Sequence, residues 1–395
     1  MTVTYLDNNA TTAVDPRVLE AMRPFFCERY GNPSSMHSFG GTVARDVARA
    51  RENLAQSLGA SAKEIVFTSG GTEADSTAIL SALATAPDRR EIVTTRVEHP
   101  AVLNLCKRLA RDRGYVVRWL SVDRQGKLDM DEVRSRITDN TAIVSVMWAN
   151  NETGVIFPVE EISEIAHEHG AIMHTDAVQA VGKVPMNLEA SQIDFLSLSG
   201  HKLHGPKGIG ALYVRRGTRF SPFVVGGHQE SDRRGGTENV PGIVGLGEAA
   251  RLCSEGFADH VATMRRLRDR LEQGLMATVP LAHLNGHPEA RLPNTLSIGF
   301  EYVEGEAILM RMDVKGICAS SGSACTSGSL EPSHVLRAMG VPFNSVHGSI
   351  RFSLSRYTTE DEISYVLEEV PPIIRGLREM SPFGREYLSA VCTVQ

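Results

Sequence analysis

Polar residues follow five short apolar segments of the chain, and several of them belong to types that act in catalysis. These residues are Thr68-Ser-Gly-Gly-Thr-Glu73 after 65–67, Glu98-His99 after 92–95, Asn150-Asn151 after 142–148, Asp176 and Gln179 after 171–174, and Ser199-Gly-His-Lys202 after 195–198. In open α/β sheets, ligands bind beyond the carboxyl ends of the strands. Each residue is a weak signal by itself, but together they predict a single pocket.

The glycine-rich run Gly70-Gly71-Thr72 lies between a predicted strand and a predicted helix, where it suits a phosphate group. Free backbone N–H groups and the helix dipole favour an anion there, and glycine lets the ligand approach closely. The alternative is an ordinary helix start, with Thr72 and Asp75 as a capping box. ATP and NAD are poorly supported, because the Walker lysine and a G-x-G-x-x-G motif are both missing.

Lys202 and Asp176 are the two charged residues that could bind a reactive cofactor. Lys202 stands between His201 and His204, and a lysine near buried surface can have a lowered pKa that makes it a Schiff-base amine. Asp176 follows an apolar strand, so we expect it to be buried and to need a cationic partner. A protonated pyridine nitrogen is one such partner. The alternatives are a surface lysine for Lys202 and a salt bridge or helix cap for Asp176.

A phosphate cradle, a lysine and an aspartate are together what pyridoxal phosphate (PLP) requires. His99 could stack on the cofactor ring and shuttle protons, although a structural histidine before Pro100 is a fair alternative. Neither HExxH nor an evident four-ligand set occurs in the sequence. We therefore predict PLP as the cofactor and no resident metal.

Of the six cysteines, Cys325 differs from the others because its neighbours cannot enclose it. Nine of the eleven residues 319–329 are Ser, Gly or Ala, and such a segment buries little apolar area. We expect a mobile loop whose thiol reaches into the pocket, with an ordinary flexible linker as the alternative. Cys392 lies in the C-terminal tail, and we expect the remaining four to be packed inside: Cys27, Cys106, Cys253 and Cys318.

Arg351 lies in the alternating segment 349–354, which predicts a strand. If it faces the cleft, its guanidinium could hold a substrate carboxylate through two hydrogen bonds. Arg356 is the competing residue, and an exterior salt bridge is the plain alternative.

The chain has 395 residues, 42% of them hydrophobic, and a net charge of 41 − 47 = −6. This composition is that of a globular protein and argues against nucleic acid as a partner. No apolar stretch reaches the length of a membrane-spanning helix, and residues 1–7 do not resemble a secretory signal. We expect a cytoplasmic protein without a membrane partner.

Apolar β segments alternate with helical patterns up to about residue 255, which predicts an α/β fold with a mostly parallel sheet of seven strands. The gap between 198 and 209 is too short for a helical crossover, so that pair of strands should be antiparallel. We predict a large domain of residues 15–255. Residues 1–14 and 256–395 should form a smaller α+β domain that carries the catalytic loop 319–332.

Six motifs resemble those of the cysteine desulfurases, and the match covers nearly the whole chain. The motifs are Tyr5-Leu-Asp-Asn-Asn-Ala-Thr-Thr12, Tyr30-Gly-Asn-Pro-Ser-Ser-Met-His37, Thr68-Ser-Gly-Gly-Thr-Glu73, Asn150-Asn-Glu-Thr-Gly154, Ser199-Gly-His-Lys-Leu-His-Gly-Pro-Lys-Gly208 and Ser323-Ala-Cys-Thr-Ser327. The chain is most similar to the NifS type, which serves nitrogenase cluster assembly. The resemblance implies a homodimeric PLP enzyme of fold type I.

The resemblance also implies a role for each residue of the pocket. Lys202 would bind the cofactor aldehyde, His99 would stack on the ring as acid and base, Asp176 would pair with the pyridine nitrogen, and Gln179 would bond the ring hydroxyl. The phosphate would be held by Gly71, Thr72, Ser199 and His201, with Thr237 coming from the other subunit. Asn151 and Arg351 would bind the substrate carboxylate, with Asn151 also next to the cofactor, and Cys325 would be the persulfide nucleophile.

The expected reaction converts L-cysteine to L-alanine and passes the sulfur from Cys325 to an iron–sulfur scaffold protein. The resemblance also allows transient ligation of an iron–sulfur cluster by Cys325. Two alternatives stay within the same fold, namely an aminotransferase and a selenocysteine lyase. A cofactor-free scaffold that binds proteins or clusters through its thiols is an alternative of another class, and an NTPase is a distant one.

Overall fold

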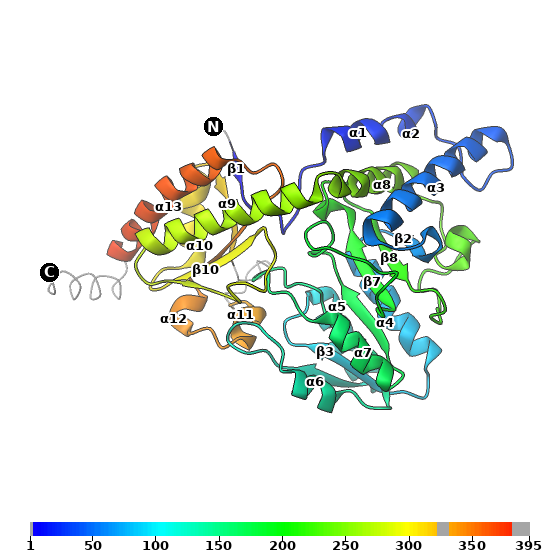
Figure 1. Ribbon diagram of the computed structural model, residues 1–395, viewed down its shortest axis with the longest axis horizontal. Coiled ribbons are helices and arrows are strands. Elements are labelled where there is room, and N and C mark those ends of the chain that lie inside the picture. Colours follow the sequence, from blue (N-terminus) through cyan, green and yellow to red (C-terminus); the bar gives the residue numbers. More distant parts are fainter. Residues whose placement is uncertain (1–2, 322–331, 381–395) are drawn as a thin grey trace.

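A computed structural model describes residues 3–321 and 332–380 (Figure 1). Its central element is a sheet of seven strands in which β8 alone runs antiparallel to its neighbours. In spatial order the strands are β2 (Ile65–Thr68), β8 (Gly210–Val214), β7 (Phe195–Ser199), β6 (Ile172–Asp176), β5 (Thr141–Ser145), β3 (Glu91–Thr95) and β4 (Val116–Leu120). The predicted sheet is confirmed, including the antiparallel pairing of β7 with β8.

Helices cover both faces of this sheet, which explains why its strands read as continuous apolar runs. Ile65 and Phe67 of β2 pack into the core on one face, while Val66 points into the core on the other. Helices α4 and α5 cover the second face, and the others cover the first. Their bounds are α1 (Pro16–Met22), α2 (Pro24–Cys27), α3 (Ser38–Leu58), α4 (Gly71–Thr85), α5 (Pro100–Arg113), α6 (Met130–Arg136), α7 (Val159–Glu168) and α8 (Val240–Ser254).

The remaining elements surround a smaller sheet with the order β12-β13-β10-β9, in which every pairing is antiparallel. Helix α9 runs from the first part of the molecule to the second (Figure 1). The elements are α9 (Phe257–Thr278), β9 (Ala282–Leu284), β10 (Thr295–Phe300), α10 (Gly305–Val314), β11 (Ile317–Cys318), β12 (Ser320–Ser321), α11 (His334–Ala338), α12 (Phe343–Val346), β13 (Ser349–Ser353) and α13 (Glu360–Met380).

The N-terminal residues belong to this second region, as their pairing shows. Strand β1 (Thr4–Tyr5) pairs with β11, and Leu6 is buried in the same core as Leu271 and Phe352. The two cores do not divide strictly at residue 255, because Leu292, Val335 and Leu336 are buried in the core of the large sheet. The predicted domain bounds stay a prediction. Short 3₁₀ turns complete the fold: η1 (Ala62–Glu64), η2 (Gly200–Lys202) and η3 (Gln229–Asp232).

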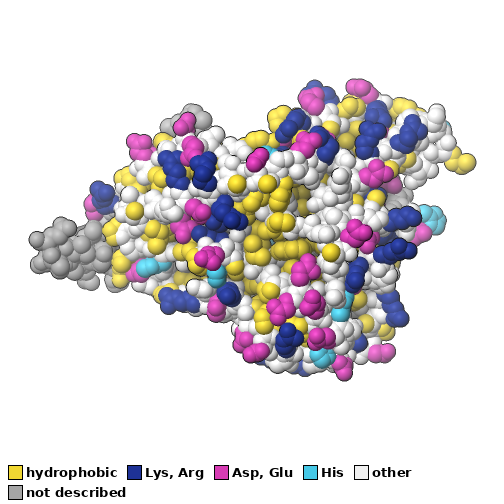
Figure 2. Space-filling view, in the orientation of Figure 1, with side chains coloured by type: hydrophobic (Ala, Val, Ile, Leu, Met, Phe, Trp, Pro, Cys, Tyr) yellow, Lys and Arg dark blue, Asp and Glu magenta, His cyan; other side chains and the backbone are white. Residues whose placement is uncertain are grey.

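Hydrophobic side chains gather on the surface between the two regions (Figure 2). They line a groove of about 1500 Å³ along α9, with Val261 on the helix and Val184 and Pro185 opposite. Within the part of the chain that the model describes, no helix is both long and apolar enough to cross a membrane. The cytoplasmic location stays a prediction.

Candidate active site

The glycine-rich turn predicted to bind phosphate joins β2 to α4. Gly70 is the N-cap of α4, and the described residues show no side-chain hydrogen bond that caps this helix, so the alternative of a Thr72–Asp75 capping box is wrong. Thr72 is exposed at the start of the helix, and the turn lies beside Ser199 at the end of β7. A Cβ on Gly210 of β8 would come within 2.7 Å of the Gly70 Cα, so glycine at 210 makes room for the turn.

Asp176 ends β6 and is buried, as predicted. Its Oδ1 accepts a hydrogen bond from the Val178 N–H at 2.9 Å, but no ion pair to Asp176 occurs among residues 3–321 and 332–380. Burial raises the pKa of this carboxyl, and the neighbouring Asp75 raises it further. His174 supplies no compensating charge, because burial lowers its pKa to about 4. A cationic ligand group would therefore stabilise the ionised Asp176.

His99 follows β3 and is the N-cap of α5, where its Nδ1 accepts the Ala101 N–H at 3.2 Å. Since Nδ1 is an acceptor, a neutral His99 ring carries its proton on Nε2. Burial lowers the pKa of His99, and the positive charges of Lys202 and His334 act in the same direction, while Asp176 opposes them. At neutral pH the ring is thus uncharged and offers a hydrogen-bond donor at Nε2.

Lys202 lies in η2, directly after β7. Its Nζ donates hydrogen bonds to the carbonyls of Ala10, at 2.7 Å, and Asn9. Burial lowers the pKa of Lys202 to about 7, and Lys183 and Arg351 contribute. Because an amine must be neutral to attack a carbonyl, this environment makes Lys202 a nucleophile near neutral pH.

His201 precedes Lys202 in η2, and its Nδ1 lies 3.1 Å from the Thr11 hydroxyl. Burial and the Lys202 charge lower the pKa of His201 to about 4, so at neutral pH the ring carries no charge and is available to an anion only as a hydrogen-bond donor. Only Gly200 separates it from Ser199, so both residues lie just at the end of β7.

Asn9 joins the N-terminal segment to both sides of the pocket, a role that the sequence analysis missed. Its carbonyl accepts a hydrogen bond from Gln179 Nε2 at 2.9 Å, besides the one from Lys202. Its side-chain amide donates to the Asn151 carbonyl at 3.2 Å and to Thr295 Oγ1 at 2.9 Å. Gln179 Oε1 is buried without a partner in the described residues, so it can accept a hydrogen bond from a ligand hydroxyl.

Arg351 lies on β13 and reaches the pocket from the second region. Its Nη1 donates to the Asn151 carbonyl at 3.0 Å and its Nη2 to Asp7 Oδ1 at 2.8 Å. Its Nε is buried with no partner in the described residues. Arg351 thus places a guanidinium beside Asn151, as the recognition of a substrate carboxylate requires.

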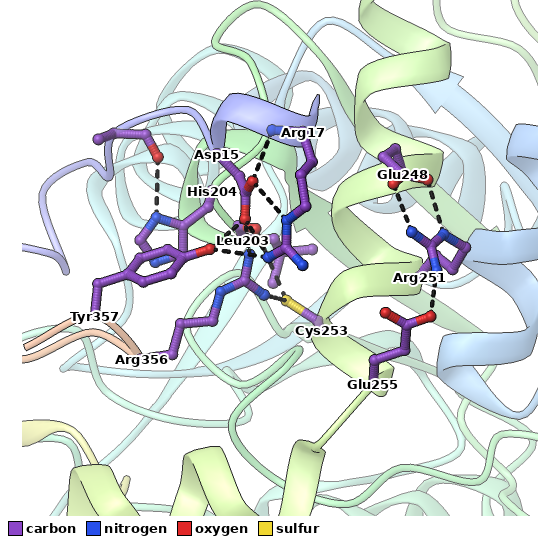
Figure 3. A network of polar contacts seen from close by, with 11 residues as sticks. Asp15, Arg17, Leu203, His204, Glu248, Arg251, Cys253, Glu255, Arg356 and Tyr357 are labelled. Carbon is purple, nitrogen blue, oxygen red and sulfur yellow. Dashed lines mark hydrogen bonds and ion pairs between the residues drawn. The ribbon is translucent and has the colours of Figure 1, made fainter. Parts of the chain in front are cut away.

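Arg356, the competing residue, is held elsewhere by a buried ion pair with Asp15 at 2.9 Å (Figure 3). The same guanidinium donates to Cys253 Sγ at 3.4 Å and lies over the ring of Tyr357. Since Asp15 accepts a hydrogen bond from the Arg17 backbone N–H at the start of α1, Arg356 ties the second region to this helix. Its contacts are structural.

Two predicted site residues are not joined to the pocket by these contacts. Thr237 is exposed in the loop between η3 and α8, and the contacts found in the described residues do not link it to Lys202 or Ser199. Cys325 lies outside the described residues, as does most of the predicted loop 319–332. Among residues 3–321 and 332–380, no group of three or more His, Cys, Asp or Glu side chains could hold a metal ion.

The four cysteines that were predicted to be packed inside differ in their burial. Cys106 is buried, as predicted, and burial raises the pKa of its thiol to about 12. Cys253 and Cys318 are half-buried. The prediction is wrong for Cys27, which is exposed because it ends the single-turn helix α2.

Glu98 is a further buried group that the sequence analysis noted at a strand end but gave no role. Its Oε1 accepts hydrogen bonds from Thr95 Oγ1 at 2.8 Å and from the Met147 N–H at 3.0 Å, linking the ends of β3 and β5. Burial raises the pKa of Glu98 to about 8, so the carboxyl is mostly neutral at pH 7. Its position next to His99 is the signal that could have identified it.

Comparisons with known proteins identify the family of this chain. The model of the family "Aminotransferase class-V" matches residues 4–366. A cysteine desulfurase of Trichormus azollae is 61% identical over 386 residues, which cover 98% of this chain and 96% of that protein. The cysteine desulfurase NifS of Azotobacter vinelandii is 58% identical over 381 residues, 96% of this chain and 94% of that protein.

A solved structure described as a NifS-like protein superimposes with a TM-score of 0.89 at 40% sequence identity, covering 95% of this chain and 100% of that one. The seven-stranded sheet, the second region and the extent of these matches leave no large part of the chain outside the family. The chain therefore belongs to the class-V aminotransferase family and, within it, to the cysteine desulfurases.

Proposed function

We propose that this protein uses PLP to convert L-cysteine to L-alanine and retains the sulfur as a persulfide on Cys325. The observation that carries the proposal is the convergence at one sheet edge of three groups: an amine with a lowered pKa, a buried carboxyl that has no ion-pair partner among the described residues, and a glycine turn. These groups, contributed by Lys202, Asp176 and Gly70-Gly71, are complementary to an aldehyde, a ring cation and a phosphate.

The side chains present suit the chemical groups of the cofactor. Asp176 would pair with its ring nitrogen, the free Oε1 of Gln179 would accept its ring hydroxyl, and Lys202 would bind its aldehyde. Gly71, Thr72, Ser199 and His201 would hold the phosphate, together with Thr237 of the second subunit in a homodimer. Bound there, PLP supplies an electron sink that acidifies the Cα–H bond of an amino acid.

The protein's own groups then position the substrate and move protons. Arg351 and Asn151 hold the substrate carboxylate, which fixes the direction of the Cα–H bond. The neutral amine of Lys202 accepts the Cα proton, because its lowered pKa leaves a lone pair available at pH 7. His99 can accept the proton that the Cys325 thiol releases and return it to the carbon skeleton as it becomes alanine, so its ring is neutral before and after the step.

Sulfur transfer breaks the C–S bond of L-cysteine and forms an S–S bond on Cys325. L-cysteine and the enzyme thiol become L-alanine and the enzyme persulfide, so atoms and electrons balance without an added oxidant. We propose an iron–sulfur scaffold protein as the acceptor. Similarity to a relative named NifS supports a role in nitrogenase cluster assembly.

Two variants test this function. Lys202→Ala should lose the bond to PLP that borohydride traps, whereas trapping at another lysine, located by mass spectrometry, would exclude Lys202. Cys325→Ala should retain the cofactor's visible absorption and its response to cysteine, yet form neither persulfide nor alanine. Alanine production at the wild-type rate by this variant would contradict the nucleophile. Amino transfer to an added keto acid would favour the aminotransferase alternative.

A further inference from the structure

The short helix α11 is attached to the active site through its first two residues. Ser333 is its N-cap, with Oγ accepting the N–H groups of Val335 at 3.0 Å and Leu336 at 3.3 Å. The same hydroxyl donates its proton to the carboxyl of Glu152. His334 Nε2 lies 3.0 Å from the Glu98 carbonyl oxygen, and since a carbonyl only accepts, Nε2 carries the proton.

Both partners adjoin residues that the proposed function uses. Glu152 follows Asn151 in a turn that Asn150 Oδ1 holds by accepting the N–H groups of Glu152 and Thr153, each at 2.9 Å. Glu98 immediately precedes His99 and is fixed by its bonds to Thr95 and Met147. A displacement of either partner therefore moves the carboxylate-binding amide or the imidazole.

Helix α11 is packed into a hydrophobic core, which fixes the position of Ser333 and His334 relative to Glu152 and Glu98. Val335 and Leu336 are buried in the core that covers the first face of the seven-stranded sheet, although the helix follows β12 of the smaller sheet in the chain. Cys325 precedes Ser333 by only eight positions in the sequence. The same short stretch of chain thus supplies the nucleophile and contacts both sides of the pocket.

We propose that Ser333 and His334 are positioning residues of the desulfurase reaction, Ser333 acting on Asn151 through Glu152 and His334 acting on His99 through the Glu98 carbonyl. The inference rests on the proposed function, because it takes Asn151 to bind the substrate carboxylate and His99 to transfer protons. Neither Ser333 nor His334 needs to touch the substrate.

In the PLP-loaded enzyme, loss of the Ser333 contact should change KM and loss of the His334 contact should change kcat. Ser333→Ala should raise KM for L-cysteine with little change in kcat, because it loosens a residue that binds substrate. His334→Phe should lower kcat with little change in KM, because it loosens a residue that moves a proton. Loss of one net hydrogen bond predicts a change of about 2- to 12-fold in each case. Ser333→Thr and His334→Gln keep a donor and should restore most of each loss.

Matched controls separate positioning from stability. Asp129→Ala removes the N-cap of α6, an exposed helix end, and repeats the capping loss of Ser333→Ala elsewhere. His283→Gln changes an exposed histidine that contacts Glu301 on the smaller sheet. Neither control should separate KM from kcat, whatever its effect on the melting temperature.

The outcomes for the two proposals differ. A wild-type protein that shows no PLP absorption and forms no alanine would contradict the proposed function itself. An active wild type whose Ser333→Ala and His334→Phe variants keep KM and kcat within about twofold would overturn the inference alone. An equal loss of both parameters that follows the melting temperature, as in the controls, would also overturn it.

Discussion

The lowered pKa of Lys202 can be measured directly in the protein prepared without cofactor. Burial moves it from the ordinary 10.5 to about 7, a difference that corresponds to about 5 kcal/mol between the two protonation states. At pH 7.5 about three quarters of the Lys202 side chains should be neutral, compared with about one in a thousand for a lysine with the ordinary pKa. The neutral amine, which is the form that an acylating reagent attacks, is thus several hundredfold more populated in Lys202.

The assay is labelling with acetic anhydride over a range of pH, with each modified lysine quantified by mass spectrometry. The labelling rate of Lys202 should reach half of its plateau near pH 7. Lys63, which is exposed in η1, is the reference within the same sample. The rate of PLP binding to the cofactor-free protein should follow the same curve, since only the neutral amine attacks an aldehyde.

Replacing Lys183 separates burial from charge as causes of the lowered pKa. Lys183 is buried, donates from Nζ to the Gln179 carbonyl at 3.0 Å, and lines the same small cavity as Lys202. Lys183→Met keeps the length of the side chain and removes its charge, so the midpoint for Lys202 should move to higher pH. A Lys202 midpoint at the ordinary value in the wild type, or no movement in the variant, would refute the electrostatic reasoning.

Three further predictions concern other parts of the site. Asp176→Asn should raise the thermal stability of the cofactor-free protein, because it removes a buried charge. The same change should weaken PLP binding at least about tenfold in equilibrium titration, because the ring cation loses its carboxylate partner. Gly210→Ala should destabilise by about 1–3 kcal/mol in urea unfolding because its Cβ would enter the Gly70 turn, whereas Gly376→Ala, with open space around it, should not destabilise. Arg351→Met should raise KM for cysteine at least about tenfold, whereas Arg356→Met should chiefly lower the melting temperature.

The sequence was sufficient for the part of the site that the large sheet builds. Strands β2, β3, β5, β6 and β7 are parallel and end at one edge, so the residues that follow them had to gather there. The apolar runs identified these strands, and the polar residue after each run identified the edge. His99, Asp176 and Lys202 could be placed by this rule alone.

The contributions of the second region could not be derived in this way. Asn9 and Arg351 are far apart in sequence, and both reach the pocket only because β13 and the N-terminal segment pack together, with the Asn9 N–H donating to Ser353 Oγ at 2.9 Å. No periodicity encodes that contact. The Thr72–Asp75 spacing suggested a capping box because it is a local pattern. The position of Asp75 depends instead on its burial against the sheet, which the local sequence does not encode.

The pKa shifts of Asp176 and Lys202 indicate why this fold should be more stable with the proposed cofactor than without it. Asp176 has a pKa of 3.8 in the unfolded chain and a higher pKa in the folded protein. Its carboxyl therefore destabilises the fold increasingly as pH rises from the lower of these two values to the higher one. An amine whose folded pKa is about 7 destabilises the fold at and below that pH, and the penalty disappears as pH rises to 10.5. Near pH 7 both penalties act together. A ligand that brings a cation to Asp176 and a covalent partner to Lys202 removes both destabilising contributions. Part of its binding free energy therefore comes from relieving two buried charges that destabilise the ligand-free fold.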